Sequence, residues 1–258
     1  MLKHLLDDIC KRRAKRLSAT SRYRDQLCEL PTGLFDHWAA TASQQFQGIP
    51  RDALFYMRSA EALMAFFDCV TLVDKPCALP SKAADSVWHA WLQYSPMSLQ
   101  QFCLKHFKRM IPHREAPDMP APMGEAMANC LVGARRLSGL MPGGPTVPPL
   151  FATDRRLRMP HGYAYRVVRG KVGVADIDAS GRRWGDIAFP AGLLPSTLLA
   201  CGLVHGWEIP DPRRHHADAG DATAGGGASA NCDGAGDGGG GGDGGGSGCG
   251  GGGGCGGG

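Results

Sequence analysis

The hydrophobic pattern of the chain changes its period once, across a segment rich in proline and glycine. Up to about residue 140, apolar side chains recur three and four residues apart, which is typical of amphipathic helices. The segment 139–149 then combines glycines with several prolines, which stop a helix. Beyond it, apolar residues alternate with polar ones around 163–167, as in strands. The sequence therefore predicts a mainly α fold, an irregular helical bundle with a small antiparallel β unit.

Three parts of the chain follow from this pattern. Residues 1–140 are predicted to form a helical domain around a central buried helix at 51–70, and residues 141–210 a small β-rich extension. About three strands are marginal alone, so this unit is expected to pack on the helices. Residues 211–258 are rich in glycine, with aspartate and cysteine, so they are expected to be a disordered tail that cannot bury enough apolar surface to fold.

A helical hairpin carries the unusual residues of the chain. Ser81 is a suitable N-cap for a helix starting at residue 82, and a second helix is expected over 98–109. Asp85 and His89 are four residues apart, so they are neighbours on the first helix. The carboxylate can then hold one imidazole nitrogen and leave the other to act as a base or a metal ligand.

One interpretation of the hairpin is a metal site. It can bring His89, Cys103, His106 and His113 together, and zinc takes ligands of these kinds. The spacing is not that of a known metal signature, because there is no Cys-x-x-Cys pair and no His-x-x-x-His on one helix.

The other interpretation of the hairpin is a structural core. In it, His89 and His113 are satisfied by Asp85 or by the backbone. The core would be formed by the aromatic residues Trp88, Trp91, Phe102 and Phe107.

The hairpin also resembles a known family. The order of the conspicuous residues is similar to that of the glycine-rich domain-containing proteins of bacteria and plants, whose hallmark is Asp-x-x-Trp-His followed by a cysteine and a later histidine. The glycine-rich C-terminus is a second point of similarity. The resemblance implies a helical module and brings no catalytic residue with it. The matching residues are Asp85, Trp88, His89, Tyr94, Phe102, Cys103, Phe107, Arg109 and His113.

Two functions are open at this point. The first is a non-enzymatic binding or regulatory module that contacts an unknown protein partner through Asp85, Trp88, His89 and Tyr94. It is favoured because the chain has no phosphate loop, nucleophile elbow or dinucleotide fingerprint. The alternative is a metal-binding protein, or a metal-dependent hydrolase, that holds zinc with His89, Cys103 and His113.

A nucleic-acid contact is a third and weaker hypothesis. It would use the basic N-terminal helix and the arginines at 135–136, 155–158 and 182–183. A formal net charge of +4 is mild, so nucleic acid is not the expected partner. The apolar stretches 60–73 and 191–204 are each about 14 residues long, shorter than the roughly 20 that a spanning helix needs, so no membrane span is expected.

Seven cysteines are scattered singly through the part of the chain before the tail. They are expected to be free thiols that act as small buried hydrophobic residues. The N-terminus lacks the pattern of a signal peptide, so the chain is expected in the reducing cytoplasm. The seven are Cys10, Cys28, Cys69, Cys77, Cys103, Cys130 and Cys201.

Overall fold

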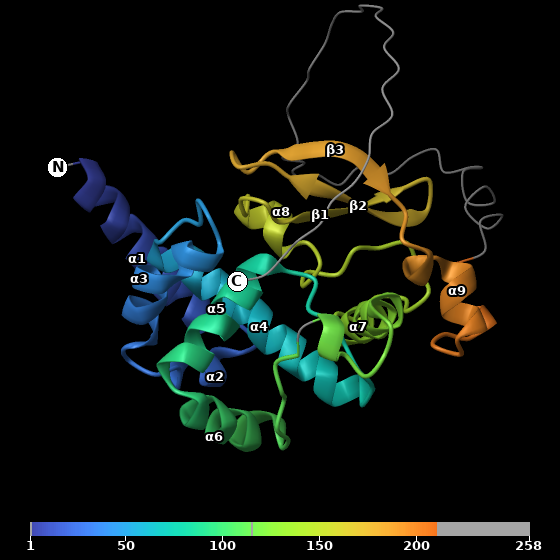
Figure 1. The fold of residues 1–258 in the computed structure, drawn as a ribbon, viewed down its shortest axis with the longest axis horizontal. Coiled ribbons are helices and arrows are strands. Elements are labelled where there is room, and N and C mark those ends of the chain that lie inside the picture. The colour runs from blue at the N-terminus through green and yellow to red at the C-terminus, as the bar shows by residue number, and fades with distance from the viewer. Residues whose placement is uncertain (1, 115, 211–258) are drawn as a thin grey trace, which may run out of the picture. The chain divides into compact units, whose positions relative to one another are not determined.

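The computed structural model describes residues 2–114 and 116–210, which belong to one compact unit. The predicted disordered tail, 211–258, lies outside the described residues. The fold is mainly α with a small antiparallel sheet, which confirms the predicted fold class (Figure 1). The helices are α1 (Leu2–Thr20), α2 (Arg24–Cys28), α3 (Leu34–Gln45), α4 (Ala53–Val73), α5 (Lys82–Tyr94), α6 (Pro96–Phe107), α7 (Met123–Leu137), α8 (Thr153–Leu157) and α9 (Pro195–Ala200), with short 3-10 turns at Ala116–Asp118, Ala191–Leu193 and Gly206–Glu208.

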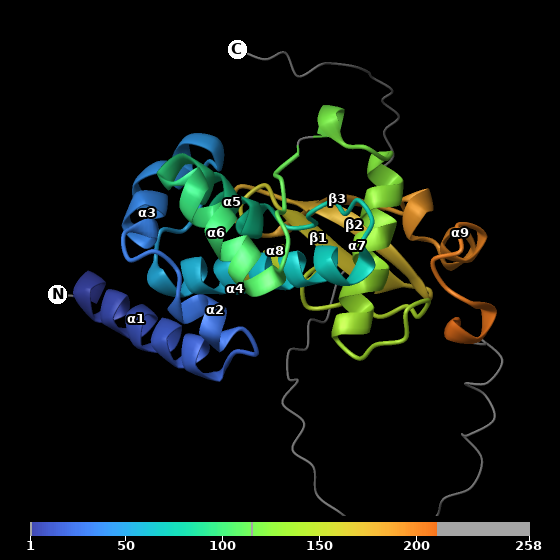
Figure 2. The same ribbon diagram turned by 90° about the horizontal axis from the view of Figure 1, so that it is seen from below.

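The central helix of the described unit is α4, as the sequence predicted. Asp52 starts it by accepting hydrogen bonds from the backbone N–H groups of Leu54 and Phe55, each at 3.0 Å. Asp74 ends it in the left-handed conformation, with a φ of 51°. Buried apolar residues cover most of its surface, because helices pack against it on several sides. Figure 2 shows α4 running through the middle of the unit, with α7 crossing it.

The crossing of α4 and α7 depends on Gly133. A Cβ atom built at this position would lie 2.4 Å from Cγ2 of Val73 and 2.6 Å from Sγ of Cys69. The two helices can therefore approach this closely only because residue 133 has no side chain.

We expect Gly133→Ala to lower the free energy of unfolding by about 1–3 kcal/mol, because it overpacks the α4–α7 contact. Gly124→Ala is the matched control on the same helix, since nothing lies within 4 Å of its Cβ position. Chemical denaturation of both variants measures the difference. Equal stabilities of the two variants would contradict the steric explanation.

The β strands form a three-stranded sheet in the order β1 (Tyr163–Val168), β2 (Lys171–Ile177) and β3 (Arg183–Ala188). All neighbours are antiparallel, and Tyr165 pairs with Val174 and Val167 with Val172. Tyr165 and Val172 belong to the same buried core as the helices, while β3 is mostly exposed. The β unit thus packs on the helices, as three strands alone would require.

A buried carboxylate joins α5 to the β unit. Asp154, on α8, is fully buried and accepts hydrogen bonds from Ser81 Oγ at 2.7 Å and from the backbone N–H groups of Lys82 and Ala83, each at 3.0 Å. It also accepts one from the N–H of Tyr163 at the start of β1, at 3.1 Å. Ser81 meanwhile caps α5 as predicted, accepting from the N–H of Ala84 at 3.1 Å.

Asp154→Ala should lower the free energy of unfolding by about 3–5 kcal/mol, because it leaves several buried donors without an acceptor. The matched control is Asp186→Ala, at an exposed position of β3, where we expect a change within about 0.5 kcal/mol. Denaturant titration of both variants is the measurement. A loss below about 1 kcal/mol at Asp154 would show that water replaces the carboxylate at little cost.

Several sequence expectations need correction here. Helix α8, at Thr153–Leu157, was not predicted. Arg135, one of the arginines of the nucleic-acid hypothesis, is buried and donates to the carbonyl groups of Thr146 and Pro142. It therefore does not present its charge to a nucleic acid. Burial lowers the pKa of Arg135 to about 10. None of the helices in 2–114 and 116–210 is both long and apolar enough to cross a membrane.

Candidate functional site

Helix α5 carries two buried tryptophans and the two polar residues of the site. Trp88 and Trp91 face the core and are 4% and 0% exposed. Asp85 and His89, one turn apart, are partly buried and lie on the side of a cavity. The cap at Ser81 fixes where the helix begins, and therefore which way Asp85 points.

The second element of the site is the loop that follows α6. Ser95 ends α5 and also starts α6, which begins at Pro96 rather than at the predicted residue 98. Lys108 ends α6 in the left-handed conformation, with a φ of 61°. The N–H of Ile111 then donates to the sulfur of Cys103, which anchors the loop two residues before His113.

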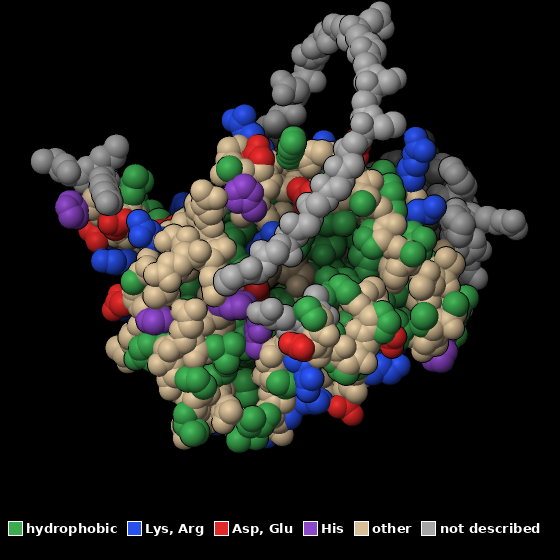
Figure 3. Space-filling model, viewed as in Figure 1, with side chains coloured by type: hydrophobic (Ala, Val, Ile, Leu, Met, Phe, Trp, Pro, Cys, Tyr) green, Lys and Arg blue, Asp and Glu red, His purple; other side chains and the backbone are tan. Residues whose placement is uncertain are grey.

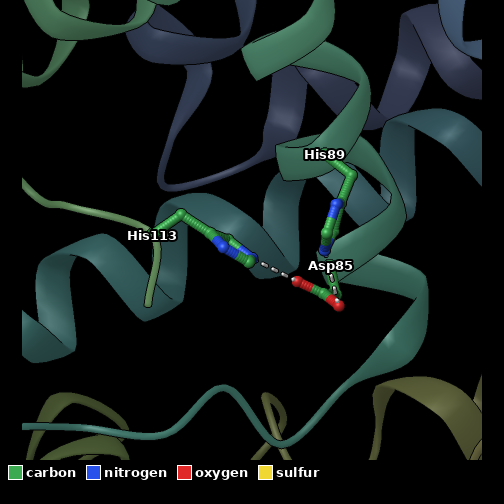
Figure 4. A group of neighbouring side chains, drawn as sticks. All are labelled: Asp85, His89 and His113. Atoms are coloured by element: carbon green, nitrogen blue, oxygen red, sulfur yellow. Dashed lines mark hydrogen bonds and ion pairs between the residues drawn. The ribbon is translucent and has the colours of Figure 1, made fainter. Parts of the chain in front are cut away.

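Asp85, His89 and His113 come together at this point. Nε2 of His113 lies 3.1 Å from Oδ1 of Asp85, and Nε2 of His89 lies 3.5 Å from Oδ2. The carboxylate therefore lies between the two imidazoles, whose ring centroids are 4.5 Å apart (Figure 4). Within the described residues, this is the group of histidine, cysteine and acidic side chains whose ligand atoms all lie within 4.8 Å of one another.

The two histidines determine the charge of Asp85. Burial by itself raises the pKa of this carboxyl, and the hydrogen bonds from His113 and His89 lower it. The net result is a pKa below the ordinary aspartate value, so Asp85 is a carboxylate at neutral pH.

A cavity of about 670 Å³ opens beside this group, and we call it the histidine pocket. Its volume lies in the range of small-molecule sites. The space-filling view shows hydrophobic side chains in a hollow of this face, with histidine side chains beside it (Figure 3). The wall is built from α4, α5, α7, β1 and two loops, and its polar or aromatic members include Asp85, Trp88, His89, His113, Tyr163 and Tyr165.

Trp88 is a wall residue of the histidine pocket rather than a surface residue. Its ring meets that of His113 edge to face at 4.6 Å. Two other buried indoles have hydrogen-bond acceptors, Ser86 for Trp38 and Ser98 for Trp91. Nε1 of Trp88 is buried and has none among the described residues.

Other predicted site residues lie elsewhere. Cys103 is buried in the core, outside the group around Asp85, and burial raises its pKa to about 11. His106 bonds to Glu29, with Nε2 2.8 Å from Oε2. Tyr94 is 42% exposed and contacts the ring of His37 instead of the pocket.

Sequence reasoning missed part of this site. Tyr163 and Tyr165 were expected only as strand residues, yet they line the histidine pocket. Cys77 was expected to be a buried hydrophobic residue, but it is half-buried and lines the same pocket. The same expectation is wrong for Cys28 and Cys201, which are exposed, as well as for Cys10, which is half-buried, and right for Cys69, Cys103 and Cys130. No local spacing signals these positions, because the contacts join distant segments.

Comparison with known proteins gives one similarity. Residues 53–177 match a family model described as UCP032817-like, just under half of the chain. The match runs from α4 to β2 and includes Asp85, His89 and His113. No curated protein and no solved structure matches the chain. The resemblance to glycine-rich domain-containing proteins stays a prediction.

Replacing both histidines should reverse the pKa shift of Asp85. In the variant His89→Ala with His113→Ala, only burial remains, so we expect the pKa to rise above the ordinary value of about 3.9. In the unchanged protein, the stabilisation from this depressed pKa is present above the unfolded value and is lost as pH falls through the folded one. Carbon-detected NMR titration of labelled aspartates measures the pKa of Asp85 in the unchanged protein and in the double variant. A pKa that stays low in the double variant would assign the shift to another cause.

Proposed function

We propose that this protein binds a divalent transition-metal ion with Asp85, His89 and His113. The observation that supports this most directly is the spacing of the ligand atoms. With metal–ligand distances of about 2.0–2.1 Å, two ligands of a tetrahedral ion lie about 3.3 Å apart. One ligand atom from each of Asp85, His89 and His113 lies within 4.8 Å of the other two, and the imidazoles approach different oxygens of the carboxylate, at 3.1 Å for His113 and 3.5 Å for His89.

The kinds of ligand narrow the choice of metal. Two imidazoles and one carboxylate suit zinc or iron(II), and three protein ligands leave coordination positions for water or a small molecule. The proposed site differs from the predicted set in one residue: Asp85 takes the place of Cys103, which lies in the core. A metal would replace the protons that the imidazoles share with Asp85, so binding should weaken as pH falls.

A small ligand bound in the histidine pocket would fill the coordination positions of the metal that the protein leaves open. Trp88 is too buried to contact a partner protein across a surface, so we place the binding function of the Trp–His hairpin inside the cavity. Lys75 and Arg109 contribute cationic side chains to its wall, and Arg109 is paired with Asp74 at 2.7 Å. Hydrolysis of a ligand by a metal-bound water is the enzymatic form of this proposal.

Metal binding is tested with the full-length protein after chelation and dialysis. We expect about one zinc ion per chain at neutral pH, and a loss of at least about tenfold in affinity in His89→Ala and in His113→Ala, because each removes one of three ligands. Isothermal titration calorimetry with zinc chloride gives affinity and stoichiometry.

His106→Ala is the matched control for these variants. It removes a histidine from the neighbouring helix, whose ring bonds to Glu29 outside the pocket, so its zinc affinity should equal that of the unchanged protein. Equal zinc binding by all four proteins would contradict the site. It would leave Asp85, His89 and His113 as a hydrogen-bonded structural group.

We also propose a cytoplasmic location. The seven cysteines within the described residues are all free thiols, which is typical of a reducing compartment.

A further inference from the structure

Three cysteines from separate elements meet at the wall of the histidine pocket. Cys69 on α4 and Cys130 on α7 are both fully buried. Cys77, in the loop between α4 and α5, is half-buried and lines the pocket. The thiol of Cys130 is a hydrogen-bond partner of Cys77, and Sγ of Cys69 donates to the carbonyl oxygen of Cys130 at 3.4 Å. One thiol is thus reachable from the pocket, and two lie behind it.

The loop that carries Cys77 is held against α7 on both sides of the cysteine. The carbonyl oxygen of Pro76 accepts from Nδ2 of Asn129 at 2.9 Å. The N–H of Ala78 donates to the carbonyl oxygen of Ala126 at 3.1 Å. Because both neighbours of Cys77 are fixed, its backbone is held against the part of α7 that carries Cys130.

The three thiols differ in their readiness to ionise. The hydrogen bonds from Cys130 and Cys69 lower the pKa of Cys77 to about 5, against the effect of burial, and the positive charge of Arg109 acts in the same direction. Burial raises the pKa of Cys130 well above its ordinary value. A thiolate that faces a cavity, with protonated thiols behind it, is the arrangement of redox-sensitive cysteines.

The thiols are not spaced as a metal site. Among the described residues, the group with all ligand atoms within 4.8 Å of one another consists of Asp85, His89 and His113.

We propose that Cys77 is a peroxide-sensitive thiol, and that Cys130 or Cys69 resolves its oxidised form as a disulfide. The Cys77 thiolate attacks one oxygen of a hydroperoxide and the O–O bond breaks. The other oxygen leaves and takes a proton from solvent, as water or an alcohol. Sulfur is oxidised by two electrons to a sulfenic acid, and the peroxide is reduced by two.

The second step closes the disulfide. The sulfur of Cys130 or Cys69 attacks the sulfenic sulfur of Cys77, so that an S–S bond forms and the S–O bond breaks. The hydroxide leaves with the proton of the attacking thiol as water. The new bond ties the pocket loop covalently to α7 or α4, so the wall of the histidine pocket would respond to oxidation whether or not metal is bound.

The test uses the full-length protein in the presence of a chelator, treated with hydrogen peroxide, blocked and digested with trypsin. Cys69 and Cys77 lie on one peptide, 59–82, because trypsin does not cut before Pro76, and Cys130 lies on 115–135. A disulfide between Cys77 and Cys130 would join these two peptides, and one between Cys77 and Cys69 would appear as the loss of two hydrogens within 59–82. We expect one of these two products. Both products should disappear in Cys77→Ser and persist in the matched control Cys28→Ser, at an exposed cysteine.

Trapping the intermediate gives a second readout. In the variant Cys69→Ser with Cys130→Ser, dimedone should label Cys77 as sulfenic acid. If peroxide yields no disulfide at Cys77 in the unchanged protein, or oxidises Cys28 and Cys201 before Cys77, the proposal is overturned. These results do not depend on metal, so they leave the proposed metal site untouched.

The pH dependence of alkylation separates a thiolate from an accessible thiol. Between pH 7 and about 5.5, the rate for an ordinary thiol of pKa about 8.5 falls about 30-fold with its thiolate fraction. For Cys77, whose pKa is lowered to about 5, we expect a fall of less than about twofold. Iodoacetamide labelling read by mass spectrometry, with a short peptide holding one free cysteine as reference, measures this. A fall equal to that of the peptide would contradict the proposal.

Discussion

The buried carboxylate of Asp154 is the interaction on which the candidate site depends. The first N–H groups of a helix have no partners within the helix, and their partial positive charge favours a nearby anion. Asp154 accepts from two of them at the start of α5 and from the first N–H of β1. Burial raises the pKa of Asp154, while its four hydrogen bonds act to lower it. One side chain thus sets the distance between the helix that carries Asp85 and the strand that closes the pocket.

Two different chemistries share the wall of that pocket. The imidazoles of His89 and His113 face it from the hairpin, and the thiol of Cys77 faces it from the preceding loop. Arg109 lines the same pocket and pairs with Asp74. Its positive charge favours the thiolate form of Cys77. A ligand in the pocket would therefore be close to both groups, and the redox state of the loop would alter the space available to it.

The sequence was informative where the physics is local. The N-cap at Ser81, the Asp85–His89 pair and the change of period near residue 140 each depend on residues a few positions apart, and each has its counterpart in the structure. Cys103 was placed in the ligand set because the hairpin can bring it together with His89 and His113. In the structure, Cys103 turns into the core and His106, on the same helix, turns to Glu29. Contacts such as that of Asp154 with Ser81 could not be foreseen, because nothing in the spacing of residues links segments 73 positions apart.

That separation has a consequence for the newly made chain. Ribosomes add about 5–20 residues per second, so Asp154 is synthesised about 4–15 seconds after Ser81. During this interval the start of α5 has its serine cap but lacks the carboxylate that accepts from Lys82 and Ala83. The helical hairpin that carries Trp88 and His89 is therefore synthesised before its hydrogen bonds to Asp154 can form. Those bonds wait for a segment that leads into the β unit.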